Sequence, residues 1–180
     1  METRNRKPAV FLDRDGVLTE EKGYISSVGD LNLFPYVPEC IRQIQAKGYY
    51  AIVVTNQSGV ARGLFTEDTL QEMNETLRKK TNVDAIFYCP HHPEGKIEEY
   101  RKECACRKPR TGMFETACRK FAIDLQNSLM VGDRAGDILA GQAAGVKTIL
   151  VESGYGTAAL ESDVTPDYIM RDLRDVLKVL

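Results

Sequence analysis

The sequence lacks any large excess of charge of one sign. Its 180 residues include 24 Lys and Arg and 26 Asp and Glu, which gives a formal net charge of −2. A protein that binds nucleic acid or an anionic membrane surface needs an excess of basic residues, and this near balance of acidic and basic residues does not provide one. We therefore expect neither nucleic acid nor a membrane as a partner.

Long apolar runs are also missing. No stretch approaches the roughly 18 apolar residues of a membrane-spanning helix. The charged start, residues 1–8, lacks the apolar core of a signal peptide. Five cysteines, an odd number, do not suggest a disulfide framework. These absences predict a cytoplasmic protein. The length and the 43% of hydrophobic residues suit one globular domain, residues 1–180, which we expect to be a monomer.

Three short apolar segments are each followed by oxygen-rich residues. Residues 9–12 lead into Asp13-Arg14-Asp15-Gly16, residues 51–55 into an amide-rich loop, and residues 128–131 into Gly132-Asp133. In open α/β sheets, ligands bind at the carboxyl ends of the strands. Two acids at positions i and i+2 repel each other unless something neutralises them, and a divalent metal ion commonly does so. The alternative for the first segment alone is a polar turn after a buried strand.

Strand and helix patterns alternate along the chain. We expect strands at residues 9–12, 51–55, 85–89, 128–131 and 148–151, and residues 168–169 suit an extra edge strand. Helices are expected at residues 37–47, 66–80, 112–121, 139–144 and from about residue 172. This alternation predicts an α/β fold, a three-layer sandwich on a mostly parallel, Rossmann-like sheet. No internal repeat or low-complexity linker interrupts it.

Three of the cysteines gather near both histidines in a long loop, residues 89–107. Cys89-x-His91 and Cys104-x-Cys106 offer three thiolates and one imidazole, which would fill a tetrahedral zinc shell and leave no open position. Such a site would be structural. The alternatives are reduced, unrelated cysteines, or a site in which His92 replaces His91. The other two cysteines lie on expected helices and are interpreted as small core residues: Cys40 and Cys118.

Four motifs, in this order, resemble those of the haloacid dehalogenase superfamily. They are Asp13-x-Asp15-Gly16-Val17, Thr55-Asn56, Lys108, and Gly132-Asp133-x-x-x-Asp137. The resemblance covers nearly the whole chain and implies the sheet predicted above. Residues 55–63 and 88–109 look more narrowly like the D-glycero-D-manno-heptose-1,7-bisphosphate 7-phosphatases. The histidinol-phosphate phosphatases share much of this pattern. The resemblance places the zinc ligand at His91 rather than at His92.

The resemblance implies a phosphatase that works through an aspartyl-phosphate. Asp13 would be the nucleophile, and Asp15 would act as general acid and base. Mg²⁺ would bridge the nucleophile and the phosphate, since two anions otherwise repel each other. Thr55 and Lys108 would bind the phosphoryl oxygens. The Mg²⁺ ligands would be Asp13, the Asp15 carbonyl and Asp133. Asp137 would orient Lys108 or a metal-bound water.

There is no room for the inserted cap domain that many members of the superfamily carry. Only 39 residues separate Asp15 from Thr55, so selectivity must come from loops. Arg107 adjoins Lys108 and could bind a second phosphate bidentately. For Tyr24 and Arg62 an ordinary loop role is the alternative. The predicted substrate-binding residues are Glu21, Lys22, Gly23, Tyr24, Asn56, Gln57, Ser58, Arg107 and Arg134.

The leading functional hypothesis is a Mg²⁺-dependent phosphatase that removes the 7-phosphate of D-glycero-D-manno-heptose 1,7-bisphosphate. The resemblance places that reaction in the heptose branch that supplies lipopolysaccharide or related glycans. The first alternative is a histidinol-phosphate phosphatase of histidine biosynthesis. The second is a non-catalytic zinc module that binds phosphorylated ligands. The presence of both Asp13 and Asp15 argues against this module, because binding alone needs no proton donor.

Overall fold

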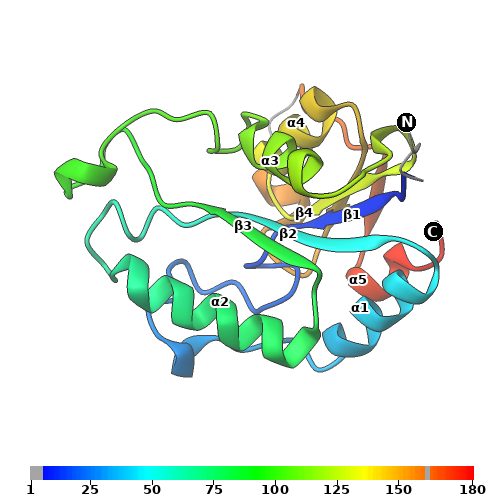
Figure 1. Ribbon diagram of the computed structural model, residues 1–180, viewed down its shortest axis with the longest axis horizontal. Coiled ribbons are helices and arrows are strands. Elements are labelled where there is room, and N and C mark those ends of the chain that lie inside the picture. The colour runs from blue at the N-terminus through cyan, green and yellow to red at the C-terminus, as the bar shows by residue number, and fades with distance from the viewer. Residues whose placement is uncertain (1–5, 161–162) are drawn as a thin grey trace.

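A six-stranded sheet in the order β3-β2-β1-β4-β5-β6 forms the centre of the computed structural model (Figure 1). The structure describes residues 6–160 and 163–180, so most of the charged start lies outside the described residues. Each neighbouring pair of these strands runs parallel. The strands are β1 (Ala9–Leu12), β2 (Tyr50–Asn56), β3 (Ala85–Cys89), β4 (Leu129–Gly132), β5 (Lys147–Val151) and β6 (Tyr168–Met170).

Helices cover both faces of the sheet (Figure 1). They are α1 (Val37–Ala46), α2 (Glu67–Thr81), α3 (Gly112–Lys120), α4 (Ala135–Ala144) and α5 (Leu173–Val176). Because side chains alternate along a strand, Val10 and Leu12 pack in the core beneath α1, α2 and α5, whereas Phe11 packs with α3 on the other face. The three-layer α/β fold predicted from the sequence is confirmed.

The helix ends follow local chemistry. α2 begins after Thr66, whose hydroxyl accepts a hydrogen bond from Thr69 N at 3.1 Å. It ends at Asn82, which adopts the left-handed conformation (φ 59°). α4 begins at Ala135, earlier than the expected 139. Its first turn was not predicted as helix because it carries polar residues of the motif. The helix expected from about residue 172 is α5, a single turn.

The parallel arrangement brings the loops that follow β1 to β5 to one edge of the sheet. One of the two longest leaves β3 and extends well beyond the sheet before it returns to α3 (Figure 1). This edge is where the predicted catalytic and metal-binding residues lie. Among the helices that the structure describes, none is long and apolar enough to cross a membrane.

Candidate active site

Three buried carboxylates meet at the carboxyl edge of the sheet. Asp13 follows β1, and its N–H donates to Val131 O of β4 at 2.9 Å, which fixes its position beside that strand. One oxygen each of Asp13, Asp133 and Asp137 lies within 4.8 Å of the others. Gly16 makes this approach possible. It has φ +85°, and a Cβ there would collide with the Asp133 carboxylate.

The electrostatics of this cluster call for a cation. Burial, followed by repulsion from Asp137, raises the pKa of Asp13 to about 7, although Lys108 opposes the shift. Burial and the neighbouring Asp13 raise the pKa of Asp133 to about 8. Oδ1 of Asp133 is buried without a hydrogen-bond partner, which is unusual for a polar atom. Hard oxygen donors with one unsatisfied atom fit Mg²⁺, which prefers such ligands.

Lys108 supplies the only ammonium that the described ion pairs place in the cluster. Its Nζ lies 3.1 Å from Asp13 Oδ1 and 2.6 Å from Asp137 Oδ1, and it donates to Val54 O at 2.7 Å. Burial would lower the pKa of this lysine, but the two carboxylates raise it, so the side chain stays charged. The Asn56 amide bonds to the backbone of Lys108 at 3.0 and 3.1 Å. Asn56, predicted as a substrate contact, thus positions Lys108.

Asp137 joins the cluster to the N-terminus of α4. Its Oδ2 accepts hydrogen bonds from the N–H groups of Asp133 and Arg134, both at 3.1 Å. Its Oδ1 is thereby directed at Lys108. Gly132 leaves the space for this arrangement, since a Cβ there would collide with the Asp137 side chain. The geometry agrees with an orienting role for Asp137.

The Asp15 carboxylate has hydrogen-bond partners outside the cluster of Asp13, Asp133 and Asp137. It accepts hydrogen bonds from Arg14 at 2.8 and 3.1 Å, from Thr19 at 3.1 Å and from Gln57 at 3.0 Å. Burial alone would raise the pKa of Asp15, but the Arg14 guanidinium lowers it. Gln57 also donates to Thr55 Oγ1 at 2.9 Å. Arg14 was not among the site residues predicted from the sequence, because it follows a strand in a polar segment, yet its side chain is fully buried.

A cleft of about 370 Å³ lies above these residues. Most of the predicted site residues line it. Thr55 and Asp133 do not; they are buried close to it. Lys22 does not line it either, and its ammonium lies 3.4 Å from Glu20. The lining residues are Asp13, Asp15, Glu21, Gly23, Tyr24, Ile25, Asn56, Gln57, Ser58, Arg107, Lys108, Arg134, Gly136, Asp137 and Tyr155.

Tyr155 and Glu21 shape one wall of the cleft. Glu21 accepts from Gly23 N at 2.6 Å and from Arg134 at 3.1 Å, so it fastens the loop after β1 to the start of α4. The Arg134 guanidinium lies 4.1 Å from the centroid of the Tyr155 ring. Tyr155 N donates to Asp133 Oδ2 at 2.9 Å. Tyr155 was not among the site residues predicted from the sequence, although its position after the fifth strand was a usable signal.

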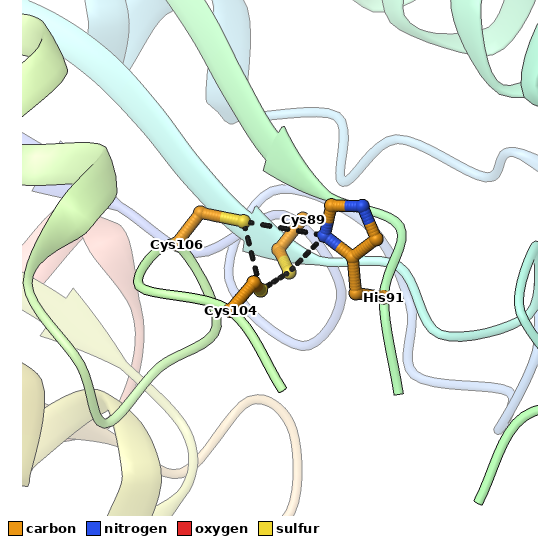
Figure 2. A group of neighbouring side chains, drawn as sticks. All are labelled: Cys89, His91, Cys104 and Cys106. Atoms are coloured by element: carbon orange, nitrogen blue, oxygen red, sulfur yellow. Dashed lines mark hydrogen bonds between the residues drawn. The ribbon is translucent and has the colours of Figure 1, made fainter. Parts of the chain in front are cut away.

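The long loop brings together the four predicted zinc ligands (Figure 2). Cys104 Sγ lies 3.1 Å from the sulfurs of both Cys89 and Cys106, and His91 Nδ1 lies 3.7 and 3.6 Å from those two sulfurs. One ligand atom of each residue lies within 4.8 Å of the others. His92 is engaged elsewhere, with Arg62 at 3.2 Å and with Glu94 N at 3.1 Å.

The sulfur atoms have the character of metal ligands. Hydrogen bonds from the other two thiols lower the pKa of Cys106 to about 5, the contact with Cys89 being the strongest. The hydrogen bond with Cys106, together with burial, raises the pKa of Cys89. Thiols this close share protons that a cation would displace, and three sulfurs with one nitrogen suit tetrahedral zinc.

The loop is anchored at both ends. Tyr88 and Tyr100 donate to the two oxygens of Glu67, in the first turn of α2, at 2.8 and 2.7 Å. At the other end, Cys106 is followed directly by Arg107 and Lys108. Arg107 lines the cleft, and its guanidinium donates to His91 O at 3.4 Å. The cysteine cluster therefore adjoins both cations in the chain and contacts Arg107 through the backbone of His91.

Known proteins resemble this chain in sequence and structure. The family model for HAD-hydrolase-like proteins matches residues 105–176. The D-glycero-beta-D-manno-heptose-1,7-bisphosphate 7-phosphatase of Haemophilus ducreyi is 42% identical, over 95% of this chain and 97% of that protein. Its Vibrio cholerae counterpart is 42% identical, over 94% of each chain.

A solved structure agrees with these relatives. The D,D-heptose 1,7-bisphosphate phosphatase from B. bronchiseptica, complexed with magnesium and phosphate, superposes with a TM-score of 0.84. It is 32% identical, and the match covers 96% of this chain and 97% of that one. On these likenesses, the chain belongs to the D-glycero-beta-D-manno-heptose-1,7-bisphosphate 7-phosphatase family of haloacid dehalogenase-like hydrolases, and so to the phosphoric monoester hydrolases.

Proposed function

We propose that this enzyme removes the 7-phosphate of D-glycero-D-manno-heptose 1,7-bisphosphate. One observation carries the proposal: a buried carboxylate, Asp13, paired with Lys108 at 3.1 Å in a cleft that Arg107 also lines. One phosphate of a bisphosphate would react at Asp13 while the other meets cations at the rim. The names of the relatives specify the beta anomer, and we propose that anomer as the preferred substrate.

Asp13 is the proposed nucleophile. Its carboxylate oxygen attacks the phosphorus, the bond from phosphorus to the sugar oxygen breaks, and an aspartyl-phosphate forms. The Lys108 ammonium and the Thr55 hydroxyl lie close to where the phosphoryl oxygens would gather charge. Mg²⁺, held by Asp13, Asp133 and the Asp15 carbonyl, would supply the charge that lets a carboxylate approach a phosphate.

Asp15 is the proposed general acid and base. It would protonate the leaving sugar oxygen and then take a proton from the water that hydrolyses the aspartyl-phosphate. Such assistance is typically worth about 10²–10⁴-fold. Asp15 lines the same cleft as Asp13 and is two residues from it in the chain, which supports this role.

The second phosphate needs its own cations. Arg107 lines the cleft, and its planar guanidinium suits bidentate phosphate binding. Arg134 also lines the cleft, in contact with Glu21 and Tyr155. Zinc held by the three cysteines and His91 would keep Arg107 in place. This arrangement favours a bisphosphate over histidinol phosphate, which carries one phosphate and an amine.

The same proposal covers the domain, the oligomeric state and the compartment. Residues 1–180 would form a single domain that acts as a monomer in the cytoplasm, on heptose precursors of lipopolysaccharide. The non-catalytic zinc module is disfavoured, because the structure brings a carboxylate cluster and a buried lysine together beside Asp15.

Phosphorus NMR on heptose 1,7-bisphosphate in Mg²⁺ buffer tests the proposal. We expect the resonance of the 7-phosphate to disappear while the 1-phosphate persists, and the beta anomer to be consumed faster than the alpha anomer. Loss of the 1-phosphate, or no turnover of either anomer, would contradict it.

A further inference from the structure

Both oxygens of the Asp15 carboxylate are fully engaged in hydrogen bonds. Oδ1 accepts from Arg14 Nε at 2.8 Å and from Thr19 Oγ1 at 3.1 Å. Oδ2 accepts from Arg14 Nη2 at 3.1 Å and from Gln57 Nε2 at 3.0 Å. A carboxylate offers about four acceptor sites, so these four donors leave none for a proton or a leaving oxygen. One donor must withdraw before Asp15 can transfer a proton.

Gln57 is the donor best placed to withdraw. Arg14 and Thr19 have no exposed surface (0% each), and the bonds from the charged guanidinium are the stronger ones. Gln57 lines the cleft, and its amide nitrogen donates to Thr55 Oγ1 as well as to Asp15. Gln57 can therefore break its hydrogen bond to Asp15 while it keeps its hydrogen bond to Thr55. Its amide oxygen accepts from Arg14 Nη2 at 3.0 Å, which fixes the orientation of the amide.

We infer that Gln57 is a positioning residue for the proton-transfer step, rather than the substrate contact that the sequence suggests. Its amide holds the Asp15 carboxylate in a defined orientation and yields one acceptor site when the leaving oxygen arrives. No covalent bond of Gln57 forms or breaks; the proton passes from Asp15 to the leaving oxygen and returns to Asp15 from water. The inference rests on the proposed function, in which Asp15 is the acid and base.

Two substrates separate this role from the others that Gln57 could have. A sugar leaving group must be protonated as it departs, whereas p-nitrophenolate needs no proton. Misplacing Asp15 therefore slows the sugar bisphosphate selectively. Misplacing Thr55 slows both substrates alike, because Thr55 would serve the phosphoryl group that they share, and the effect cancels in the ratio of their kcat values. Loss of a direct substrate contact would raise KM instead.

The test is the ratio of kcat on heptose 1,7-bisphosphate to kcat on p-nitrophenyl phosphate in Gln57→Met. We expect the ratio to fall about tenfold, a part of what acid and base assistance supplies, with the KM for the bisphosphate changing less than about twofold. Gln71→Met, on the exposed side of α2, is the matched control and should leave the ratio unchanged. An unchanged ratio in Gln57→Met, or a large rise in KM at constant kcat, would overturn the inference.

A second variant guards against misfolding. Gln57→Asn keeps the amide but shortens the side chain by one methylene, so the variant should fold and still lower the ratio.

Asp15→Asn tests separately whether Asp15 is the general acid and base. If that variant loses both activities equally, the proposed role of Asp15 fails and the inference falls with it. If Asp15→Asn is selective and the Gln57 variants are not, only the inference fails.

Discussion

At the scale of single residues, the carboxylate of Asp13 carries the proposed chemistry. It is 8% exposed, lies among two other acids and has Lys108 as its cationic neighbour. Burial and the nearby acids weaken its charged form, so the protein relies on cations to keep a nucleophile available. Removing the nucleophile leaves the packing around it nearly unchanged.

Asp13→Asn should therefore abolish turnover while the protein remains folded. An amide of the same shape cannot form the acyl-phosphate. Single-turnover phosphate release, measured beside a thermal melt, checks this prediction. Appreciable phosphate release by a folded Asp13→Asn protein would rule out the nucleophile assignment.

Arg107→Ala should weaken binding of the bisphosphate selectively. Losing a charged hydrogen bond costs about 1.5–3 kcal/mol, which corresponds to a rise in KM of about 10- to 150-fold. A small monophosphate should be nearly unaffected, since it lacks the second phosphate. Arg101→Ala, an exposed position in the same loop, is the matched control. Equal losses on both substrates would mean that Arg107 serves the reacting phosphate.

The sequence motifs predicted residues for the proposed chemistry but not the partners that hold those residues in place. The acids at the ends of β1 and β4 could be predicted because parallel strands share one carboxyl edge. The bonds of Asn56 to the Lys108 backbone and of Glu21 to Arg134 join residues far apart in the chain. No local pattern encodes them, so these bonds were not predicted from the sequence.

At the scale of elements, the loop between β3 and α3 orders the cations of the site. It has little regular structure, and a loop of this length is commonly mobile unless something holds it. The Glu67 carboxylate holds its first half through Tyr88 and Tyr100, and the cysteine cluster holds its second. The grouping of three cysteines with a histidine was predicted from the sequence, with the choice of His91 resting on the family resemblance, whereas the anchor on α2 was not predicted.

Cys104→Ser should release zinc and lower activity indirectly. We expect purified protein to hold about one zinc per chain, as a closed four-ligand site would, and the variant to hold much less. Elemental analysis and kcat/KM on the bisphosphate check this together. Cys118→Ser, on α3 outside the cluster, is the control. Wild-type protein prepared without chelators and found free of zinc would contradict the site.

The start of α5 offers a test of pH-dependent stability. Asp172 accepts hydrogen bonds from the backbone and guanidinium of Arg174 at 2.7–3.0 Å. The guanidinium contacts chiefly lower the pKa of Asp172. A carboxyl whose pKa is lowered on folding adds stability above its unfolded pKa, about 3.9, and that stability disappears as the pH falls through the folded pKa.

Asp172→Ala should consequently lower the free energy of unfolding by about 1 kcal/mol at pH 7, the usual cost of losing a helix cap. The difference from wild type should shrink below about pH 4. Urea titrations between pH 7 and about pH 3 measure it, with the exposed Asp163→Ala as control. A difference that stays constant across this range would show that the Asp172 charge is not responsible.

At the scale of the whole molecule, one edge of one sheet carries every proposed function. The same cleft is lined or underlain by all the loops that leave the carboxyl ends of β1 to β5, including the loop between β3 and α3 that carries Lys108. Loops rather than an inserted domain line it. The layered architecture was predictable from the alternation of strand and helix patterns. The early start of α4 was not, because the polar residues of its first turn look like a loop.

Comparative kcat/KM measurements on heptose 1,7-bisphosphate and histidinol phosphate, in Mg²⁺ buffer with zinc-replete enzyme, test the central claim most directly. That claim is that the second phosphate selects the substrate through cations in a cleft without a cap. We predict a value at least about 100-fold higher for the bisphosphate, the order expected from one to two charged hydrogen bonds. Equal values, or a preference for histidinol phosphate, would contradict it.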